Sequence, residues 1–301
     1  MKKIIHLIPY DGIGGVESAS NTMQGLKNEY VEFEIFYIFN KQRSKWNYFS
    51  SLSPAKIFSA AYKLQAKKPD LIIVSLWRSC IVATVLKLFS PKTKIILFLH
   101  YPHHYHLADM FFTKIISATC DGIWADSQDT LISRIPSFPL ERSDVISFVA
   151  RRLEPSRYNK NKPDFIFWGR LHEQKCIDRA IKIFAKIQSK YHQATFTIIG
   201  PDGGELNSLK NLVNKLGITK SINFTGSQDL DSIKAYSNKS SFYLQTSKLE
   251  GMAMSVVEAM QLGLLPVVTP VGEIKSYCKD KKHALLVSDD SSAIDSIFNL
   301  L

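Results

Sequence analysis

Short, continuously apolar segments alternate with helical segments along the whole chain, and this alternation occurs in both halves. Strands that are apolar on both faces are typical of parallel sheets covered by helices on each side. The pattern therefore predicts an α/β protein with two doubly wound domains. The expected strands are 4–10, 33–39, 70–76, 94–100, 122–127 and 144–149 in the first half and 164–169, 195–200, 221–226, 241–246, 265–270 and 284–287 in the second; 50–68 and 176–191 are examples of the expected helices.

The chain length also favours two domains, because 301 residues exceed what one hydrophobic core usually supports. The segment 151–164, RRLEPSRYNKNKPD, is polar, contains two prolines and separates two expected strands, so it is interpreted as a linker. The expected domains are residues 1–155 and 160–301. Ligands of doubly wound folds bind beyond the carboxyl ends of the strands, so two facing sheets would form a cleft between the domains.

Cysteines and histidines give no indication of a metal or cofactor. The four cysteines are scattered and form no C-x-x-C pair, which favours free thiols in a reducing compartment. The segment 100–106, HYPHHYH, holds four histidines in seven positions but has no cysteine or carboxylate partner at ligand spacing. We therefore expect no metal site and no cofactor.

The net charge of +11 is concentrated in the first half, where residues 1–160 hold 21 Lys and Arg against 13 Asp and Glu. Such an excess of positive charge is typical of proteins that bind an anionic membrane surface or nucleic acid. It is equally typical of a protein whose lysine-rich surface is only solvated. Because no nucleic-acid-binding motif accompanies the charge, nucleic acid is not expected. No apolar run reaches the roughly 18 residues that span a bilayer.

Several loops after expected strands carry residues suited to an anionic ligand. Gly14 and Gly15 would let the backbone approach an anion, or would simply form a tight turn. Arg170 and Lys175 flank a turn into a helix and suit a diphosphate, although exposed basic residues are common on this chain. His100 ends an expected strand, where it would reach the cleft or pack on the surface.

Two glutamates eight residues apart stand out in the otherwise apolar segment 247–260, SKLEGMAMSVVEAM. Glu250 is expected in the loop after a strand, and Glu258 one turn into a helix that runs from Met254 to Leu262 and stops at Gly263. One carboxylate would take sugar hydroxyls and the other a ribose diol. The N–H groups at the start of this helix are expected to form a phosphate-binding site. The residues of this loop that are expected to bind are Gly251, Met252, Ala253 and Met254.

Together these segments resemble the retaining glycosyltransferases of family 4, whose signature is E-x7-E. EGMAMSVVE matches this signature, and GIGGVE resembles the family's N-terminal glycine loop. FLH resembles the strand that ends in an active-site histidine, and WGRLHEQKCIDRAIKIF resembles the GR-L-x3-K-G-x-D block. FTG, which contains Gly226, and EAMQLGLLPVVTPVGEI resemble the later nucleotide-binding segments. The resemblance covers most of the chain and is strongest from 165 to 287.

The resemblance implies the GT-B fold, with two facing Rossmann-like domains, an acceptor-binding N-terminal domain and a C-terminal domain that binds a nucleotide-sugar. It implies that Arg170 and Lys175 neutralise the leaving diphosphate, and that Glu258 holds the ribose. Glu250 would contact the donor sugar near its reacting carbon, and His100 would line the acceptor side. Gly14 and Gly15 would close over the phosphates, and Gly226 would help to bind the donor. The family uses no metal.

The sequence departs from the family pattern at three places. Cys176 replaces the usual glycine after the lysine, and Met252 and Ala253 replace the commoner Phe-Gly. The chain stops at Leu301, soon after the last expected strand, whereas the family usually continues for a few helices. We therefore expect the C-terminal helices to be short or absent.

The implied function is retaining transfer of a sugar from a nucleotide-sugar donor, with UDP favoured over GDP. The acceptor would be a growing glycan or a polyprenyl-diphosphate-linked sugar, in the synthesis of lipopolysaccharide O-antigen, capsule or another surface polysaccharide. The expected location is the cytoplasm, peripheral on the inner membrane, where the basic first half and the segment 43–49, RSKWNYF, would contact anionic lipid. The alternatives are a nucleotide-sugar epimerase of GT-B fold and a non-catalytic partner subunit. The sequence does not indicate an oligomeric state.

Overall fold

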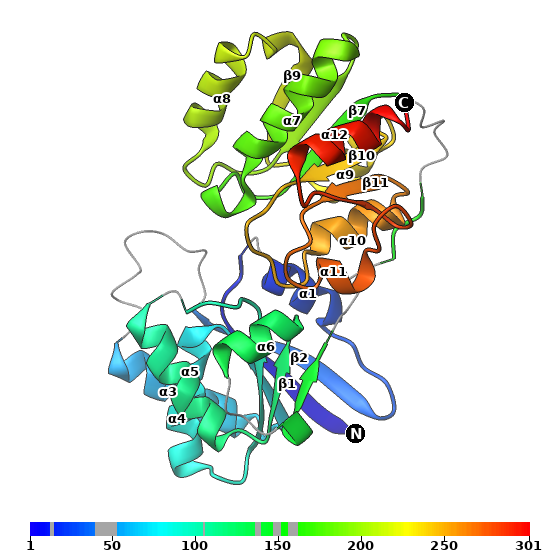
Figure 1. Cartoon of the computed structure of the whole chain (residues 1–301). Coiled ribbons are helices and arrows are strands. Elements are labelled where there is room, and N and C mark those ends of the chain that lie inside the picture. Colours follow the sequence, from blue (N-terminus) through cyan, green and yellow to red (C-terminus); the bar gives the residue numbers. More distant parts are fainter. Residues whose placement is uncertain (13–14, 40–52, 105, 136–139, 147–151, 156–161) are drawn as a thin grey trace. The chain divides into compact units, whose positions relative to one another are not determined.

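The computed structural model describes residues 1–12, 15–39, 53–104, 106–135, 140–146, 152–155 and 162–301. The chain divides into two compact units, Met1–Arg151 and Arg152–Leu301, which are considered one at a time (Figure 1). Each unit contains a six-stranded parallel sheet, in the orders β2-β1-β3-β4-β5-β6 and β12-β11-β10-β7-β8-β9. Both sheets carry crossover helices, so the predicted doubly wound α/β fold class is confirmed.

In the N-terminal sheet β1 is an interior strand, because it pairs in parallel with both β2 and β3. This arrangement explains why residues 5–10 are continuously buried. The strands of this unit are β1 (Lys2–Tyr10), β2 (Val31–Phe39), β3 (Leu71–Ser75), β4 (Lys94–Leu99), β5 (Gly122–Ala125) and β6 (Ser143–Val145).

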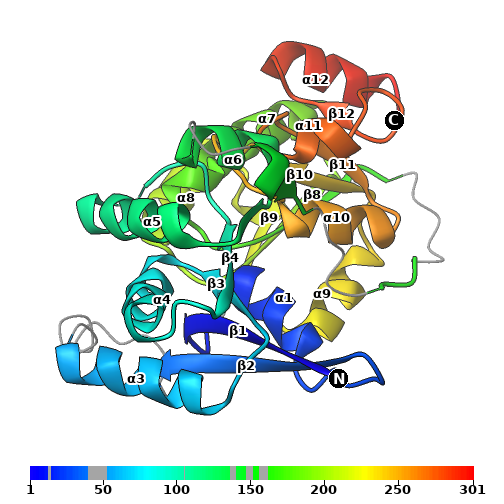
Figure 2. The same cartoon turned by 90° about the horizontal axis from the view of Figure 1, so that it is seen from below.

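Helices cover both faces of this sheet (Figure 2). On one face, buried side chains of α3, α4 and α5 pack with the strands, and α4 contacts both α3 and α5. On the other face, Val16 of α1 packs against a buried cluster that includes Ile8, Phe33 and Phe98. The helices are α1 (Gly15–Met23), α3 (Pro54–Ala66), α4 (Trp77–Phe89), α5 (Leu107–Thr119) and α6 (Gln128–Arg134), with the 3₁₀ turn η1 (Leu140–Arg142).

The C-terminal sheet has β7 and β10 at its centre, hydrogen-bonded to each other. Phenylalanines fill the space between this sheet and its helices, with Phe165 stacked on Phe242 at 4.8 Å between ring centroids. The strands are β7 (Asp164–Trp168), β8 (Thr195–Ile199), β9 (Ile222–Gly226), β10 (Phe242–Gln245), β11 (Leu265–Val268) and β12 (Leu285–Leu286).

The helix α7 shows why the sequence folds as it does here. Its buried residues include Ile177, Ala180, Ile181 and Phe184, which recur every three or four positions and form one apolar stripe. This stripe faces the sheet, and α8 and α12 contact α7 on its flanks. The helical elements are η2 (Glu173–Lys175), α7 (Ile177–Lys190), α8 (Leu206–Lys215), η3 (Thr219–Ser221), α9 (Leu230–Ser237), α10 (Met254–Gln261), α11 (Ile274–Tyr277) and α12 (Asp290–Phe298).

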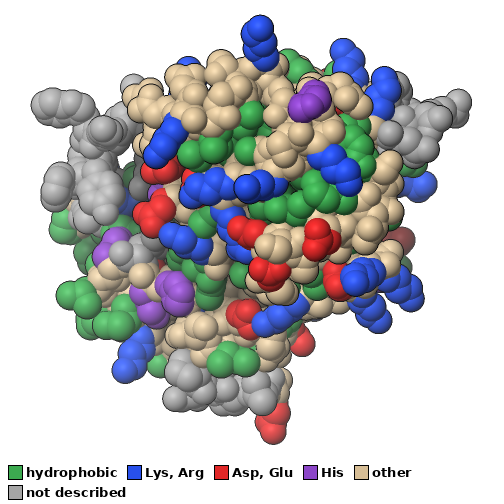
Figure 3. All heavy atoms as spheres, turned by 45° about the horizontal axis from the view of Figure 1, so that its top comes forward, with side chains coloured by type: hydrophobic (Ala, Val, Ile, Leu, Met, Phe, Trp, Pro, Cys, Tyr) green, Lys and Arg blue, Asp and Glu red, His purple; other side chains and the backbone are tan. Residues whose placement is uncertain are grey.

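The beginning of the expected linker is anchored to the C-terminal unit. Leu153 is buried, and its N–H donates a hydrogen bond of 2.9 Å to Oε1 of Gln261 in α10. Residues 156–161 and the aromatic segment 43–49 lie outside the described residues. Basic and acidic side chains are interspersed over the face that Figure 3 shows. Among the described helices, none is both long and apolar enough to cross a membrane.

Candidate active site

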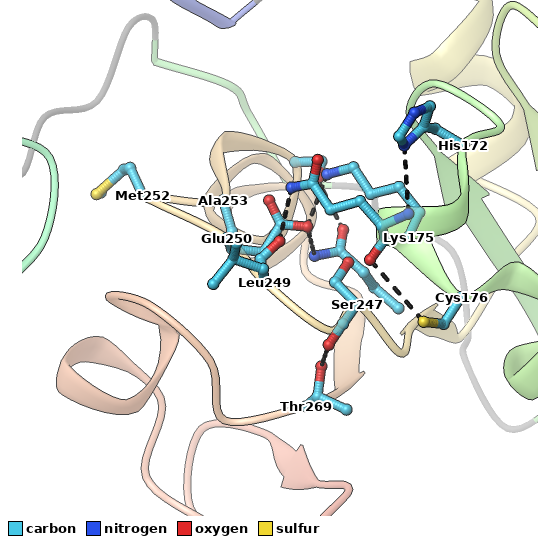
Figure 4. A network of polar contacts seen from close by, with 12 residues as sticks. His172, Lys175, Cys176, Ser247, Leu249, Glu250, Met252, Ala253 and Thr269 are labelled. Carbon is cyan, nitrogen blue, oxygen red and sulfur yellow. Dashed lines mark hydrogen bonds and ion pairs between the residues drawn. The ribbon is translucent and has the colours of Figure 1, made fainter. Parts of the chain in front are cut away.

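Glu250 forms an ion pair with Lys175, although 75 residues separate them in the sequence. Glu250 lies in the loop after β10, and Lys175 ends η2, which follows the neighbouring strand β7. The carboxyl ends of adjacent parallel strands meet at one edge of the sheet, and this brings the two side chains together (Figure 4). Nζ of Lys175 is 2.7 Å from Oε1 of Glu250, and only 7% of the glutamate side chain is exposed.

Gln245 is the second partner of the Glu250 carboxylate. Oε1 of Gln245 accepts hydrogen bonds from the Tyr243 hydroxyl at 2.6 Å and from the Ser255 hydroxyl at 3.0 Å. The amide nitrogen of Gln245 is thereby directed to Oε1 of Glu250, at 3.1 Å. One oxygen of the carboxylate thus accepts two hydrogen bonds. Its other oxygen, Oε2, has no hydrogen bond within the described part of the chain.

Glu258 lies in α10 and is held by an indole. Nε1 of Trp168, the last residue of β7, donates to Oε2 of Glu258 at 3.0 Å. Burial raises the pKa of the Tyr243 hydroxyl well above its ordinary value, and the carboxylates of Glu250 and Glu258 both add to the shift. Tyr243 therefore stays a hydrogen-bond donor, and both carboxylates lie near this one hydroxyl.

The loop between the two glutamates is fixed by a tight backbone contact. Ala253 has φ of +53°, a left-handed conformation that precedes the first turn of α10. The carbonyl of Met252 accepts a hydrogen bond of 2.8 Å from the Tyr277 hydroxyl. Gly272 lies directly against the carbonyls of Glu250 and Gly251, where a Cβ would collide with both. Gly251 also accepts a hydrogen bond of 3.0 Å from the N–H of Glu273.

The remaining predicted residues of this unit also follow strands. Arg170 is exposed two residues after β7, and its guanidinium makes no hydrogen bond or ion pair with any described residue. Gly203 packs against the stem of Arg170. Gly226 ends β9 with φ of +72°, and Met254 is the half-buried first residue of α10. The structure thus brings Glu250 and Lys175 into contact, with Glu258 nearby, whereas Arg170 pairs with none of the residues that the structure describes.

In the N-terminal unit, His100 directly follows β4 and is half-buried. Its Nε2 lies 2.9 Å from the Ser75 hydroxyl at the end of β3. Burial lowers the pKa of His100 to about 3, so its imidazole is neutral at physiological pH. Gly15 is the first residue of α1, and Gly14 lies outside the described residues.

Sequence reasoning did not find several residues that position the two glutamates. Gln245, Trp168, Tyr243 and Tyr277 look like ordinary strand or helix residues, and Gly272 like an ordinary turn. The available signal was placement, because Gln245 and Trp168 are the last residues of adjacent strands. Within the described chain, no three His, Cys, Asp or Glu side chains are grouped so that they could hold a metal ion.

Two six-stranded parallel sheets, one in each unit, and the solved structures reported below define the class of the protein, which is that of the GT-B fold. The C-terminal unit belongs to the glycosyl transferases group 1 family, whose model matches residues 151–298. This confirms the predicted fold and the coarser part of the predicted family.

Curated relatives point to the same family. An uncharacterized glycosyltransferase of Haemophilus influenzae is 35% identical over 100 residues, which are 33% of this chain and 27% of that protein. An uncharacterized glycosyltransferase of Methanocaldococcus jannaschii is 27% identical over 81% of this chain and 66% of its own length. The GtfA subunit of a UDP-N-acetylglucosamine–peptide N-acetylglucosaminyltransferase of Streptococcus parasanguinis is 29% identical, over 66% of this chain and 39% of its own. The chain therefore spans less than two thirds of the length of these relatives.

Solved structures match along the whole chain. The apo form of the lipopolysaccharide outer core galactosyltransferase WaaB has a TM-score of 0.73 and 18% identity, covering 100% of this chain and 90% of that one. Anabaena Alr3699/HepE in complex with UDP-glucose has a TM-score of 0.76 and 17% identity, covering 99% and 89%. At these identities the likeness concerns the fold.

Proposed function

We propose that the protein is a retaining glycosyltransferase that moves a sugar from a nucleotide-sugar donor, UDP rather than GDP, to a glycan or lipid-linked acceptor. The observation that carries the proposal is the pair of glutamates around the start of α10, one held by Lys175 and Gln245 and the other by Trp168. The family of the C-terminal unit and the glycosyltransferases among its relatives support it.

Each side chain has a role that matches its surroundings. The Oε2 atom of Glu250 contacts the donor sugar near its reacting carbon, and Glu258 binds the ribose diol. Arg170 neutralises the diphosphate with its exposed guanidinium, together with Lys175. The N–H groups at the start of α10 bind phosphate oxygens, because the first turn of a helix leaves them without partners. Gly226 and the loop of Gly251, Met252, Ala253 and Met254 complete the donor site.

In the proposed reaction the bond between the anomeric carbon and the diphosphate oxygen breaks, and a bond from the acceptor oxygen forms on the same face. The departing diphosphate takes the proton of the acceptor hydroxyl. No metal or cofactor takes part in this scheme. Stabilisation of the diphosphate charge by fixed cations is the main catalytic contribution, since such preorganised charges need no reorganisation during the reaction.

Calorimetric titration with UDP, and separately with GDP, in the presence of EDTA tests the donor site. We expect one nucleotide to bind, and Glu258→Ala and Arg170→Ala to weaken binding by tenfold or more. Lys210→Ala, which removes an exposed cation from α8, serves as the control and leaves binding within twofold. If neither nucleotide binds the folded protein, the proposal is wrong.

Incubation with UDP-glucose and with UDP-N-acetylglucosamine, in the absence of acceptor, tests the reaction. Slow release of free UDP supports a transferase, whereas an epimerised nucleotide-sugar would make the protein an isomerase. Loss of UDP release in Glu250→Ala supports the catalytic role of that residue. An unchanged rate in this variant would contradict that role, and an absence of UDP release from the wild type would favour a non-catalytic partner subunit.

We also propose that the protein acts in surface-polysaccharide synthesis, for example of O-antigen or capsule, in the cytoplasm at the inner membrane. The net charge of +11 supports contact with anionic lipid. Sedimentation with phosphatidylglycerol vesicles at low and high salt tests this contact, with phosphatidylcholine vesicles as control. We expect binding to the anionic vesicles that salt abolishes, and equal binding to both vesicle types would contradict the proposal.

A further inference from the structure

Behind His100, two serines and a second histidine form a buried row of side chains within the N-terminal unit. The Ser75 hydroxyl lies 2.9 Å from Nε2 of His100 and 2.8 Å from Nε2 of His6. The other ring nitrogen of His6, Nδ1, lies 2.9 Å from the Ser20 hydroxyl. Ser75 is fully buried, and His6 and Ser20 are 6% and 3% exposed. The row follows from the sheet order, because β1 pairs with β3 and β3 pairs with β4.

The far end of this row has a fixed direction. The Ser20 hydroxyl is 2.8 Å from the carbonyl oxygen of Val16, one turn earlier in α1. A carbonyl can only accept, so the single proton of Ser20 lies between these two oxygens. Ser20 is therefore an acceptor for His6, and Nδ1 of His6 must carry a proton.

The donor and acceptor at Ser20 determine the donor and acceptor in each of the other hydrogen bonds of the row, as far as His100. His6 is neutral because burial lowers its pKa to about 4, so its Nε2 carries no proton once Nδ1 does. The Ser75 hydroxyl must then donate to His6 and can only accept from His100. Nε2 of His100 is thus the protonated nitrogen, and Nδ1 is left with a bare lone pair.

We propose that this row of hydrogen bonds holds His100 with its proton on Nε2 and leaves Nδ1 as an acceptor, so that the ligand group at His100 is a hydrogen-bond donor such as a hydroxyl. This inference rests on the proposed function for its ligand, a sugar hydroxyl. A bare nitrogen cannot bond a phosphate, carboxylate or carbonyl oxygen, since none of these supplies a proton. His6 is then a positioning residue that acts through Ser75, and it does not touch the substrate.

Nuclear magnetic resonance of protein labelled with ¹⁵N-histidine tests the protonation of the two rings without any ligand. Protonated and bare ring nitrogens differ widely in ¹⁵N chemical shift, and long-range couplings separate the two tautomers. We expect the proton on Nδ1 in His6 and on Nε2 in His100 at pH 7. A proton on Nδ1 of His100 would overturn the inference, whether or not the protein binds a nucleotide.

The variant His6→Phe tests whether the row sets the tautomer of His100. A phenyl ring keeps the shape but offers no acceptor, so the Ser75 hydroxyl turns to donate to Nε2 of His100. We expect the proton of His100 to move to Nδ1, whereas His192→Phe, at an exposed position, leaves it on Nε2. An unchanged tautomer in His6→Phe would contradict the inference. If His6→Phe does not fold, the tautomer of His100 is measured in Ser75→Ala instead. Without the serine hydroxyl we expect both tautomers of His100. The Nε2–H tautomer alone would contradict the inference.

Titration of His6→Phe with UDP tests the hydroxyl assignment, because UDP has phosphates but no transferable sugar. Affinity for UDP within twofold of the wild type is expected, since the ligand group inferred at His100 is a hydrogen-bond donor and not a diphosphate oxygen. A gain of tenfold or more would place a phosphate oxygen at His100, because the proton that moves to Nδ1 would then donate to it, and would overturn the assignment. If UDP does not bind the wild type either, the proposed function fails, while the tautomer measurement still decides the inference about the row.

Discussion

At the scale of single residues, the buried carboxylate of Glu250 makes stability depend on the cation that faces it. Replacing Lys175 by alanine leaves this carboxylate buried without its cation. Such a loss costs about 3 kcal/mol, because desolvation of the remaining charge is no longer compensated. Urea unfolding of Lys175→Ala measures the cost.

Lys182→Ala is the matched control, since Lys182 pairs with Asp178 at 2.8 Å on the exposed face of α7. An exposed pair of this kind contributes about 0.5 kcal/mol or less. We also expect the double variant Lys175→Ala/Glu250→Gln to recover part of the stability that Lys175→Ala loses. Equal losses in the two lysine variants would contradict the importance of burial at this pair.

A second prediction at this scale concerns the pH dependence of stability. The pKa of His6 is about 4 in the folded protein, below its ordinary 6.5, so the unfolded chain binds a proton between these values that the folded chain does not. The contribution to stability is therefore complete above about pH 6.5 and is lost as the pH falls toward 4. We expect His6 to lower the free energy of unfolding by about 1 to 2 kcal/mol between pH 7 and pH 5.

Urea unfolding at the two pH values, for the wild type and for His6→Phe, isolates this term. The drop in the variant should be smaller by that amount, even if the variant is less stable at both pH values. His100 contributes with the same sign in both proteins, because its pKa is also lowered. If the free energy of unfolding falls equally in the wild type and in His6→Phe between pH 7 and pH 5, His6 is not a neutral buried group.

At the scale of elements, the close approach of Gly272 to the loop before α10 predicts the effect of one added methyl group. In Gly272→Ala, Cβ collides with the carbonyls of Glu250 and Gly251, and φ is +56°. The strain of a positive φ costs about 1 kcal/mol, and the collision adds about 1 to 3 kcal/mol. Thermal and urea unfolding measure the total.

Gly217→Ala separates the two terms, because Gly217 has φ of +71° and open space where Cβ would lie. We expect only the smaller cost there. Nucleotide binding should also fall in Gly272→Ala, since the displaced loop carries Glu250, and it should be unaffected in Gly217→Ala. If the two variants lose equal stability, the contact between Gly272 and the loop does not fix that loop.

The elements themselves were largely predictable, because each depends on a local pattern. The apolar spacing of 176–191 predicted a helix that the structure bounds at Ile177 and Lys190, and α10 was predicted to one residue at its end. The pair of Lys175 with Glu250 was not predictable in the same way. It needs the adjacency of β7 and β10, which no local pattern specifies. The row from Ser20 to His100 likewise depends on which strands are neighbours.

At the scale of the whole molecule, each unit has its own sheet and hydrophobic core. A fragment of residues 152–301 is therefore expected to fold alone, because its core is complete within that range. Circular dichroism and thermal unfolding of the fragment measure this, and a spectrum without helix or a melt without a transition would contradict it.

The folded fragment also tests how much of the donor site the C-terminal unit supplies. The pair of glutamates, Arg170 and the start of α10 all lie in it, so the fragment should bind UDP within about tenfold of the intact chain, a difference of about 1.4 kcal/mol. The variant Glu258→Ala of the fragment should then lose binding as it does in the whole protein. A folded fragment that binds no UDP, beside an intact chain that does, would show that residues before Arg152 contribute most of the nucleotide affinity. The contact with phosphate that the sequence predicts for Gly15, the first residue of α1, would then become the first interaction to test.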